Sequence, residues 1–262
     1  MSFLDHLEVL RSHLIRSSIA ILVGMIAAFI GVEYLFDGII LAPLDPHFAT
    51  YSWICEITTA LGGSTFCDTS WSIPLKNIQF MGEFTMHMQI SLIAGIIVAF
   101  PYIIWELWRF VRPGLHERER KNGGLIIFFV AGLFFLGVLF GYYILSPLSV
   151  QFFGTYSISD TFATEATPQS YVSLVTTLTL ATGLIFELPV LAYFFSSIGL
   201  LTPEWMKKYR RHAIVVVLIF AAIITPPDVY SQVLVAIPVM FLYQISIVIS
   251  SRVNRRRNSR TA

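Results

Sequence analysis

The hydrophobic pattern divides the chain into six long apolar segments with polar stretches between them. A transmembrane α-helix needs about 20 mostly apolar residues to cross about 30 Å of hydrocarbon. The six segments are Leu14–Phe36, Gln89–Leu107, Leu125–Leu148, Tyr171–Gly199, Ala213–Thr225 and Ser231–Ser250. This pattern predicts an all-α polytopic membrane protein with six transmembrane helices.

The last two segments are predicted to form a hairpin. As a single helix, Ala213–Ser250 would be about 60 Å long at about 1.5 Å per residue, twice the hydrocarbon thickness. The sequence Thr225-Pro226-Pro227-Asp228 interrupts it. Neither proline has an amide hydrogen, and each disfavours helical geometry in the residue before it. We therefore predict short fifth and sixth helices.

The composition excludes a water-soluble globule. The chain is 56% hydrophobic and 13% charged, whereas soluble domains have about 25% charged residues. We interpret residues 1–262 as one membrane domain with a polar loop at 37–82 and a basic tail at 251–262. Residues 1–13 carry several charges and are predicted to be an amphipathic cytoplasmic segment, not a cleavable signal peptide.

Basic residues alternate from loop to loop. All but Lys76 lie before or at the very start of the first apolar segment, or after the second, fourth and sixth. Because cytoplasmic loops of membrane proteins are enriched in Lys and Arg, this distribution predicts that both termini are cytoplasmic. The first outer loop holds both cysteines, Cys55 and Cys67. In an oxidising compartment a disulfide between them would contribute about 3 kcal/mol; two free thiols are the alternative.

Two acidic residues are expected to be functional: Glu187 within the fourth apolar segment and Asp228 between the fifth and the sixth. Glu187 interrupts the fourth segment, and a carboxylate at that depth costs about 2.5–3.5 kcal/mol on insertion scales. Pro189 is predicted to kink the helix there and open a polar notch; the alternative is that Glu187 snorkels into water. The fifth segment spans only about 20 Å, which places Asp228 and, one turn later, Gln232 below the outer surface. Helix capping by Asp228 is the alternative.

The cytoplasmic side carries a mixed-charge surface. Glu106 and the run from His116 to Lys121 are expected to be solvated. With Asp5 and Glu8 they supply carboxylates on the side where a cationic ligand approaches. Carboxylates accept bidentate hydrogen bonds from guanidinium groups, so a site for an arginine-bearing peptide is chemically available.

Enzyme chemistry finds little support in the sequence. The six histidines are scattered without metal-ligand spacing, and no GxSxG elbow, Walker lysine or dinucleotide-binding glycine pattern is present. We expect no catalytic residues, no cofactor, no metal and no nucleic-acid partner. The rival functional classes are a secondary transporter of a small molecule and an intramembrane hydrolase. The transporter usually shows internal repeats, and the hydrolase needs a nucleophile and a base; we find neither.

Several stretches resemble the TatC family, and they occur in the family's order over nearly the whole chain. They are His6-Leu7-Glu8-Val9-Leu10-Arg11, which resembles the family's HLxELR segment, Ala42-Pro43-Leu44, Phe110-Val111-Arg112-Pro113-Gly114-Leu115 with Glu119-Arg120, Phe186-Glu187-Leu188-Pro189-Val190, and Thr225-Pro226-Pro227-Asp228-Val229-Tyr230-Ser231-Gln232.

The resemblance implies a receptor and core subunit of twin-arginine protein export in the bacterial inner membrane. Such a subunit binds twin-arginine signal peptides of folded cargo, assembles with TatA/TatB-type single-span subunits and with copies of itself among membrane lipids, and depends on the proton motive force. The residues implied for signal-peptide binding are Glu8, Arg11, Phe110, Glu119 and Arg120. Those implied for an intramembrane partner site are Glu187, Thr225, Asp228 and Gln232, with Pro43, Pro189, Pro226 and Pro227 as structural positions.

Two positions depart from the family pattern. The family commonly has a glutamate where this chain has Val9, so one of the two usual carboxylates for the arginine pair is absent. Glu8 points about 100° away from that position around a helix, which leaves open whether it substitutes. Gln244 also stands where a glutamate is often found, which removes a charge from the last helix.

Overall fold

The computed structural model is all-helical, as the hydrophobic pattern predicts. It describes residues 3–60, 67, 73–112, 123–156, 166–197, 199–224 and 229–261. In these ranges the one β-type pairing is an isolated bridge between Leu75 and Ala166. Five helical stretches are long and apolar enough to cross a membrane: Leu7–Ile30, Gly82–Val111, Gly124–Thr155, Pro168–Ser197 and Val235–Arg255.

The fifth and sixth predicted helices differ from each other in length. Helix α11, Arg210–Ile224, has 15 residues, so it extends only about 22 Å at about 1.5 Å per residue. Helix α12, Val229–Thr261, has 33 residues, and the prediction of a short sixth helix is therefore wrong. Arginine is a good helix former, so the basic tail continues the helix beyond the apolar segment. The predicted turn at residues 225–228 lies outside the described residues.

The first helix begins and ends earlier than the first apolar segment. Helix α1 runs without a break over Phe3–Ile30, so the charged amino-terminal segment, from Phe3 on, belongs to the same helix as the first span. It ends at Gly31, because glycine is a poor helix former. The short helix α2, Val32–Leu35, and the π-helix η1, Phe36–Ile40, follow.

The chain forms two compact units. The amino-terminal unit comprises Met1–Gly132 and Val150–Thr176, and the carboxy-terminal unit comprises Leu133–Ser149 and Thr177–Ala262. Each unit has its own helix packing.

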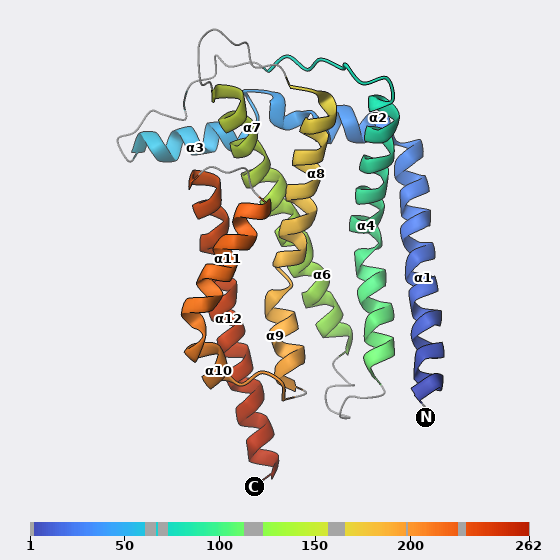
Figure 1. Ribbon diagram of the computed structural model, residues 1–262, viewed down its shortest axis with the longest axis vertical. Coiled ribbons are helices and arrows are strands. Elements are labelled where there is room, and N and C mark those ends of the chain that lie inside the picture. The colour runs from blue at the N-terminus through green and yellow to red at the C-terminus, as the bar shows by residue number, and fades with distance from the viewer. Residues whose placement is uncertain are drawn as a thin grey trace. The chain divides into compact units, whose positions relative to one another are not determined.

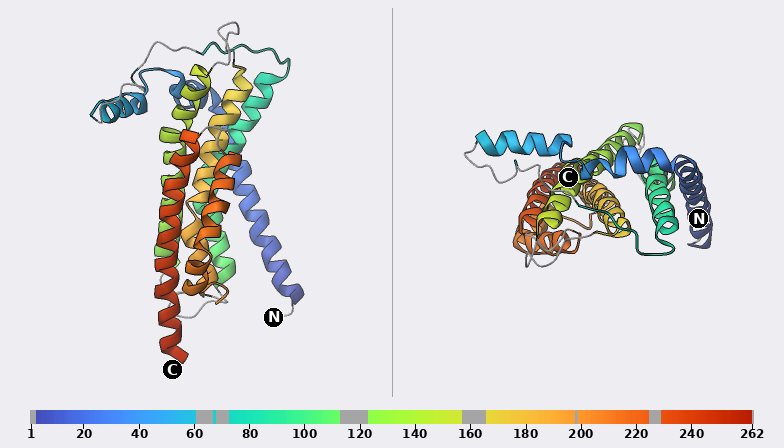
Figure 2. Two further views of the ribbon diagram at one scale, coloured as in Figure 1. Left: turned by 60° about the vertical axis from the view of Figure 1, so that its left-hand side comes forward. Right: turned by 90° about the horizontal axis from the view of Figure 1, so that it is seen from above.

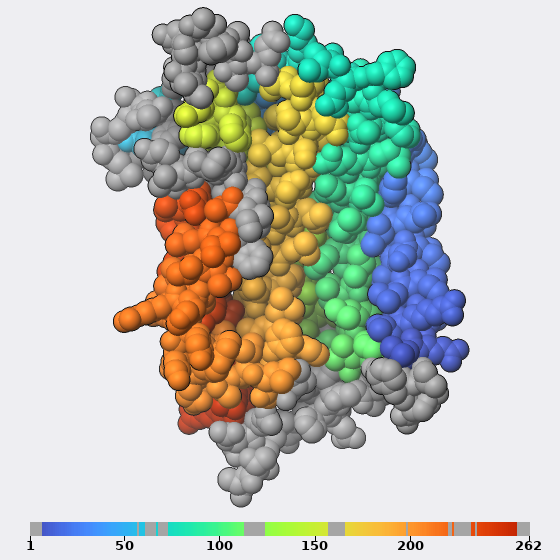
Figure 3. Space-filling view, in the orientation of Figure 1, coloured from blue at the N-terminus to red at the C-terminus, as the bar shows by residue number. Residues whose placement is uncertain are grey.

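In the amino-terminal unit, α1 packs along helix α4, Gly82–Val111 (Figures 1, 2 and 3). The two backbones nearly touch where Gly24 faces Gly95, since a Cβ atom added to Gly24 would lie 3.0 Å from the Gly95 carbonyl oxygen. Nearer the end of α1, the rings of Phe29 and His87 stack at 3.9 Å. Small residues at the crossing allow this close approach of two membrane helices.

Short helices close one end of this unit. The 3-10 helix η2, Ala42–Leu44, holds the buried Pro43, whose carbonyl accepts a 2.8 Å hydrogen bond from the Tyr51 hydroxyl. Burial, with the Tyr171 phenol as a second cause, raises the pKa of Tyr51, so this hydroxyl stays protonated as a donor. On helix α8, Pro168–Ile185, Tyr171 donates to the carbonyl of Ile40 at 2.5 Å. The hydrogen bond from Tyr171 therefore ties the end of η1 to helix α8.

A disulfide joins Cys55, on helix α3 (Ala49–Ala60), to Cys67, with a sequence separation of 12. On the chain-entropy model a loop of this length contributes about 3 kcal/mol to stability. We expect reductant to lower the thermal unfolding temperature of the purified protein, and the double variant Cys55→Ser/Cys67→Ser to show the same drop without reductant. If the unmodified protein and the double variant unfold together, the disulfide contributes nothing.

The carboxy-terminal unit packs α12 against helix α9, Leu188–Ser197, and helix α10, Pro203–Lys208 (Figure 1). The buried contact is small and apolar, made by Ala192, Met206 and Ile247. At its edge the hydroxyl of Ser196 donates to that of Ser250 at 2.8 Å.

The third apolar segment forms one continuous helical run. Helix α6, Gly123–Phe140, continues through the π-helix η4, Gly141–Leu145, into helix α7, Ser146–Thr155. At the π-turn the Ser146 hydroxyl donates to the Gly141 carbonyl at 2.9 Å.

Candidate functional site

A buried carboxylate lies where α1 begins and α4 ends. Glu106, near the last turn of α4, is 1% exposed. Its Oε2 atom bonds to Nδ1 of His13 on α1, and its Oε1 accepts from the Tyr102 hydroxyl at 3.1 Å. Two guanidinium groups are also near, Arg109 at 3.4 Å from Oε1 and Arg16 at 4.0 Å from Oε2. Glu106 therefore links the two helices through a polar cluster.

Helical spacing explains how this cluster forms. Tyr102 and Arg109 lie four residues before and three residues after Glu106, so all three share one face of α4. His13 and Arg16 are likewise three residues apart on α1. The contact between the helices at Gly24 and Gly95 holds these two faces together.

The cluster contacts one of the predicted signal-peptide residues. The ring of Phe110 meets the ring of His13 edge to face, with 6.1 Å between centroids. Phe110 is half-buried and lies one turn after Glu106 on α4. The structure thus brings Phe110 to the amino-terminal part of α1.

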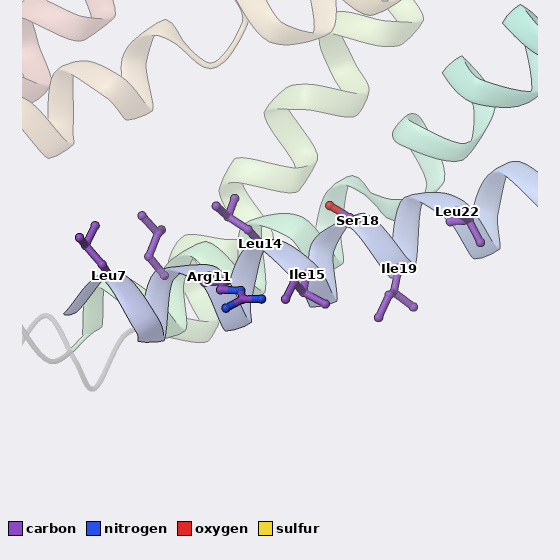
Figure 4. Close-up of a pocket in the computed structure, with 8 residues that line it drawn as sticks. Leu7, Arg11, Leu14, Ile15, Ser18, Ile19 and Leu22 are labelled. Carbon is purple, nitrogen blue, oxygen red and sulfur yellow. The ribbon is translucent and has the colours of Figure 1, made fainter. Parts of the chain in front are cut away.

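Other predicted residues lie apart from this cluster or outside the described residues. Glu8 and Arg11 are exposed on α1. Arg11 stands among Leu7, Leu14 and Ile15 on an apolar face of the helix (Figure 4). Glu119 and Arg120 lie outside the described residues.

The expectation of a solvated Glu106 is wrong. The residue is the one acid in the second apolar segment, and that isolation is the feature of the sequence that marks it. Its partner His13 is 93 positions away, so helical periodicity alone could not pair them.

Glu187 occupies the predicted break in the fourth span. Helix α8 ends at Ile185 and α9 begins at Leu188, so the helix is interrupted just before Pro189. Around it the Val190 amide donates at 3.0 Å to the carbonyl of Glu187, three residues back and not the helical four. The side chain is 8% exposed, and neither carboxylate oxygen has a hydrogen-bond partner among the described residues.

The predicted patch at the last hairpin is described only in part. Gln232 is half-buried and donates from Nε2 to the carbonyl of Leu218 at 3.2 Å, which ties α12 to α11. Thr225, Pro226, Pro227 and Asp228 lie outside the described residues.

Gln244 is a neutral hydrogen-bond partner for a cation. With its amide oxygen turned toward Arg210, it accepts from Nη2 at 3.0 Å and from Nε at 2.9 Å. Arg210 is therefore bound at this position by a neutral amide and not by a carboxylate. No group of three potential metal ligands occurs in the described part of the chain.

Comparison with known proteins identifies the family. A family model described as Sec-independent protein translocase protein (TatC) matches residues 5–238. The chain belongs to the TatC family. As a TatC-family protein it is a multi-pass inner-membrane component of twin-arginine translocation and a transport receptor, not an enzyme. These findings confirm the predicted family, localisation and non-enzymatic role.

Individual TatC relatives align with nearly the whole chain. The TatC protein of Blattabacterium sp. subsp. Periplaneta americana is 38% identical over 259 residues, covering 98% of this chain and 97% of the relative. That of Aquifex aeolicus is 33% identical over 258 residues, covering 98% of each. A crystal structure of the twin-arginine translocase receptor TatC superposes with a TM-score of 0.75 at 32% identity, covering 94% of this chain and 99% of that one.

Proposed function

We propose that this protein binds twin-arginine signal peptides at the end of the molecule where α1 begins and α4 ends. The observation that carries this proposal is the contact of His13 with both Glu106 and Phe110. It joins the two segments, the start of α1 and the end of α4, that carry the residues implied for signal-peptide binding. Glu8, Arg11, Glu119 and Arg120 complete the proposed site.

The proposed topology has six spans with both termini in the cytoplasm. Helix α11 is the fifth span, and its length of 15 residues is below the roughly 20 needed to cross an average bilayer. The bilayer thins around it, because a short span draws the two lipid surfaces together. The basic loops then all lie on the cytoplasmic side.

Partner subunits of the TatA/TatB type are proposed to bind within the membrane at Glu187, Thr225, Asp228 and Gln232. Glu187 is a buried carboxylate with no hydrogen-bond partner in the part of the chain that the structure describes. Such a carboxylate is costly in hydrocarbon and marks a place where a polar group from another helix is accommodated. Copies of this chain assemble with these partners in a larger complex, and the proton motive force drives export without a nucleotide.

Photocrosslinking of a twin-arginine signal peptide in membranes that contain the partner subunits tests the receptor function. We expect crosslinking that requires both arginines of the peptide and that is lost in Glu119→Ala. The Glu8→Ala variant measures the contribution of the exposed acid on α1. Absence of crosslinking to the unmodified chain would contradict the proposal, and solute transport by the subunit reconstituted alone would favour a secondary transporter.

A further inference from the structure

Glu106 already binds guanidinium groups, but loosely. Strong guanidinium–carboxylate bonds are about 2.7–2.9 Å long. The two guanidinium groups near Glu106 are farther away, at 3.4 Å for Arg109 and 4.0 Å for Arg16. The carboxylate is therefore arranged to accept a guanidinium group while its own arginines use it poorly.

The arginines that cover Glu106 are free to leave it. Their side chains are 43% exposed for Arg109 and 49% for Arg16, against 1% for the carboxylate. In the same conformation the guanidinium carbon of Arg109 lies 4.8 Å from the centre of the Trp105 ring, so part of the contact that Arg109 makes does not depend on Glu106. His13 holds Oε2 of Glu106 from the side of α1, so the carboxylate stays in place when the arginines move.

Glu106 lies next to the face of α1 that includes Val9. Val9 and His13 are both half-buried and lie one turn apart, so they share the face of α1 that packs on α4. Glu8 is exposed on another face. Because Glu106 bonds to His13, its carboxylate lies at the face of α1 on which Val9 provides no acid.

We propose that Glu106 is a guanidinium-binding residue for the signal peptide in this protein. One arginine of the peptide displaces Arg109 from Oε1, while its neighbouring side chains reach Phe110. The assignment rests on the proposed receptor function and names an acid within it that the family pattern does not predict.

Peptide binding to the partner-containing complex in nanodiscs tests the assignment. The probes are a fluorescent twin-arginine peptide and the same peptide with twin lysines, and the readout is the ratio of their Kd values. A lost charge-assisted hydrogen bond lowers affinity roughly 10- to 100-fold. We expect a loss of that size for the arginine peptide in Glu106→Gln, with a smaller loss for the lysine peptide, because an ammonium group is more strongly hydrated than a guanidinium and gains less from a buried carboxylate.

A second variant changes binding in the opposite direction. Arg109→Gln removes the resident competitor and is expected to tighten binding of the arginine peptide. Arg112→Gln is the matched control: it makes the same charge change near the same helix end, at an exposed side chain, and should affect both peptides equally. If Glu106→Gln does not fold, the comparison of Arg109→Gln with Arg112→Gln tests the assignment by itself.

The outcomes separate this assignment from the receptor function itself. An unchanged arginine-to-lysine ratio in folded Glu106→Gln overturns the assignment, as does equal behaviour of Arg109→Gln and Arg112→Gln. Loss of the ratio in Glu8→Gln alone would give the role to Glu8. No binding to the unmodified complex removes the receptor function and this assignment with it.

Discussion

Replacing Gly95 by leucine is expected to separate α1 from α4 and to lower the stability of the amino-terminal unit. A Cβ atom at position 95 would lie 2.5 Å from the backbone nitrogen of Met25 and 2.8 Å from its Cα atom. Backbone atoms in a helix cannot rotate away as a side chain can. Overpacking usually costs about 1–3 kcal/mol, and we expect a loss of about 3 kcal/mol or more at this position.

Gly132→Leu is the control for this substitution. Gly132 also lies in a membrane helix of the same unit, but apart from its chain neighbours and the backbone of its own helix, no atom of the described residues lies within 4 Å of a Cβ placed there. Thermal unfolding in detergent should leave Gly132→Leu close to the unmodified protein and shift Gly95→Leu strongly downward. Equal unfolding temperatures for the two variants would show that the α1–α4 crossing tolerates a side chain.

Replacing Glu187 by methionine is expected to stabilise the protein and to impair export. The buried carboxylate has no hydrogen-bond partner among the described residues, and a carboxylate in the membrane costs about 2.5–3.5 kcal/mol. Methionine has a similar length and no such cost, so we expect stability to rise by about 2 kcal/mol. If a partner helix uses the carboxylate, its loss lowers the affinity for that partner about tenfold for each 1.4 kcal/mol of binding, and export falls with it.

Leu184→Met is the control for packing changes in the same turn. Leu184 is 52% exposed, so its replacement should alter neither stability nor export. Export assays with a twin-arginine substrate and thermal unfolding of the purified variants give the two readouts. Wild-type export by Glu187→Met would remove the partner-site role, and unchanged stability would mean that the carboxylate is solvated or paired.

The sequence predicted those features that depend on neighbouring residues along the chain. The helix break beside Pro189 follows from the missing amide proton, and the structure has it between Ile185 and Leu188. The all-helical fold follows from the length of the apolar segments. In both cases the physical cause lies within a few turns of one helix.

Features that depend on contacts between helices could not be predicted in this way. The solvated Glu106 expected from its charged surroundings is instead buried by α1. The close approach at Gly95 depends on which residue of α1 faces it. The predicted length of α12 was too short because the apolar segment ends near Ser250 while the helix continues to Thr261. Hydropathy marks the membrane boundary and not the end of a helix.

The packing of α1 on α4 also bears on how the chain is made. No residue in the apolar stretch of α1, Leu7–Ile30, is buried, and its main packing contacts among the described residues are with α4. A ribosome synthesises about 5–20 residues per second, so α1 waits several seconds in the bilayer before its partner emerges. During that interval His13 and Arg16 have no Glu106 to bind. The first helix is therefore inserted before its packing partner exists, and its contact with α4 forms only after the second span has been made.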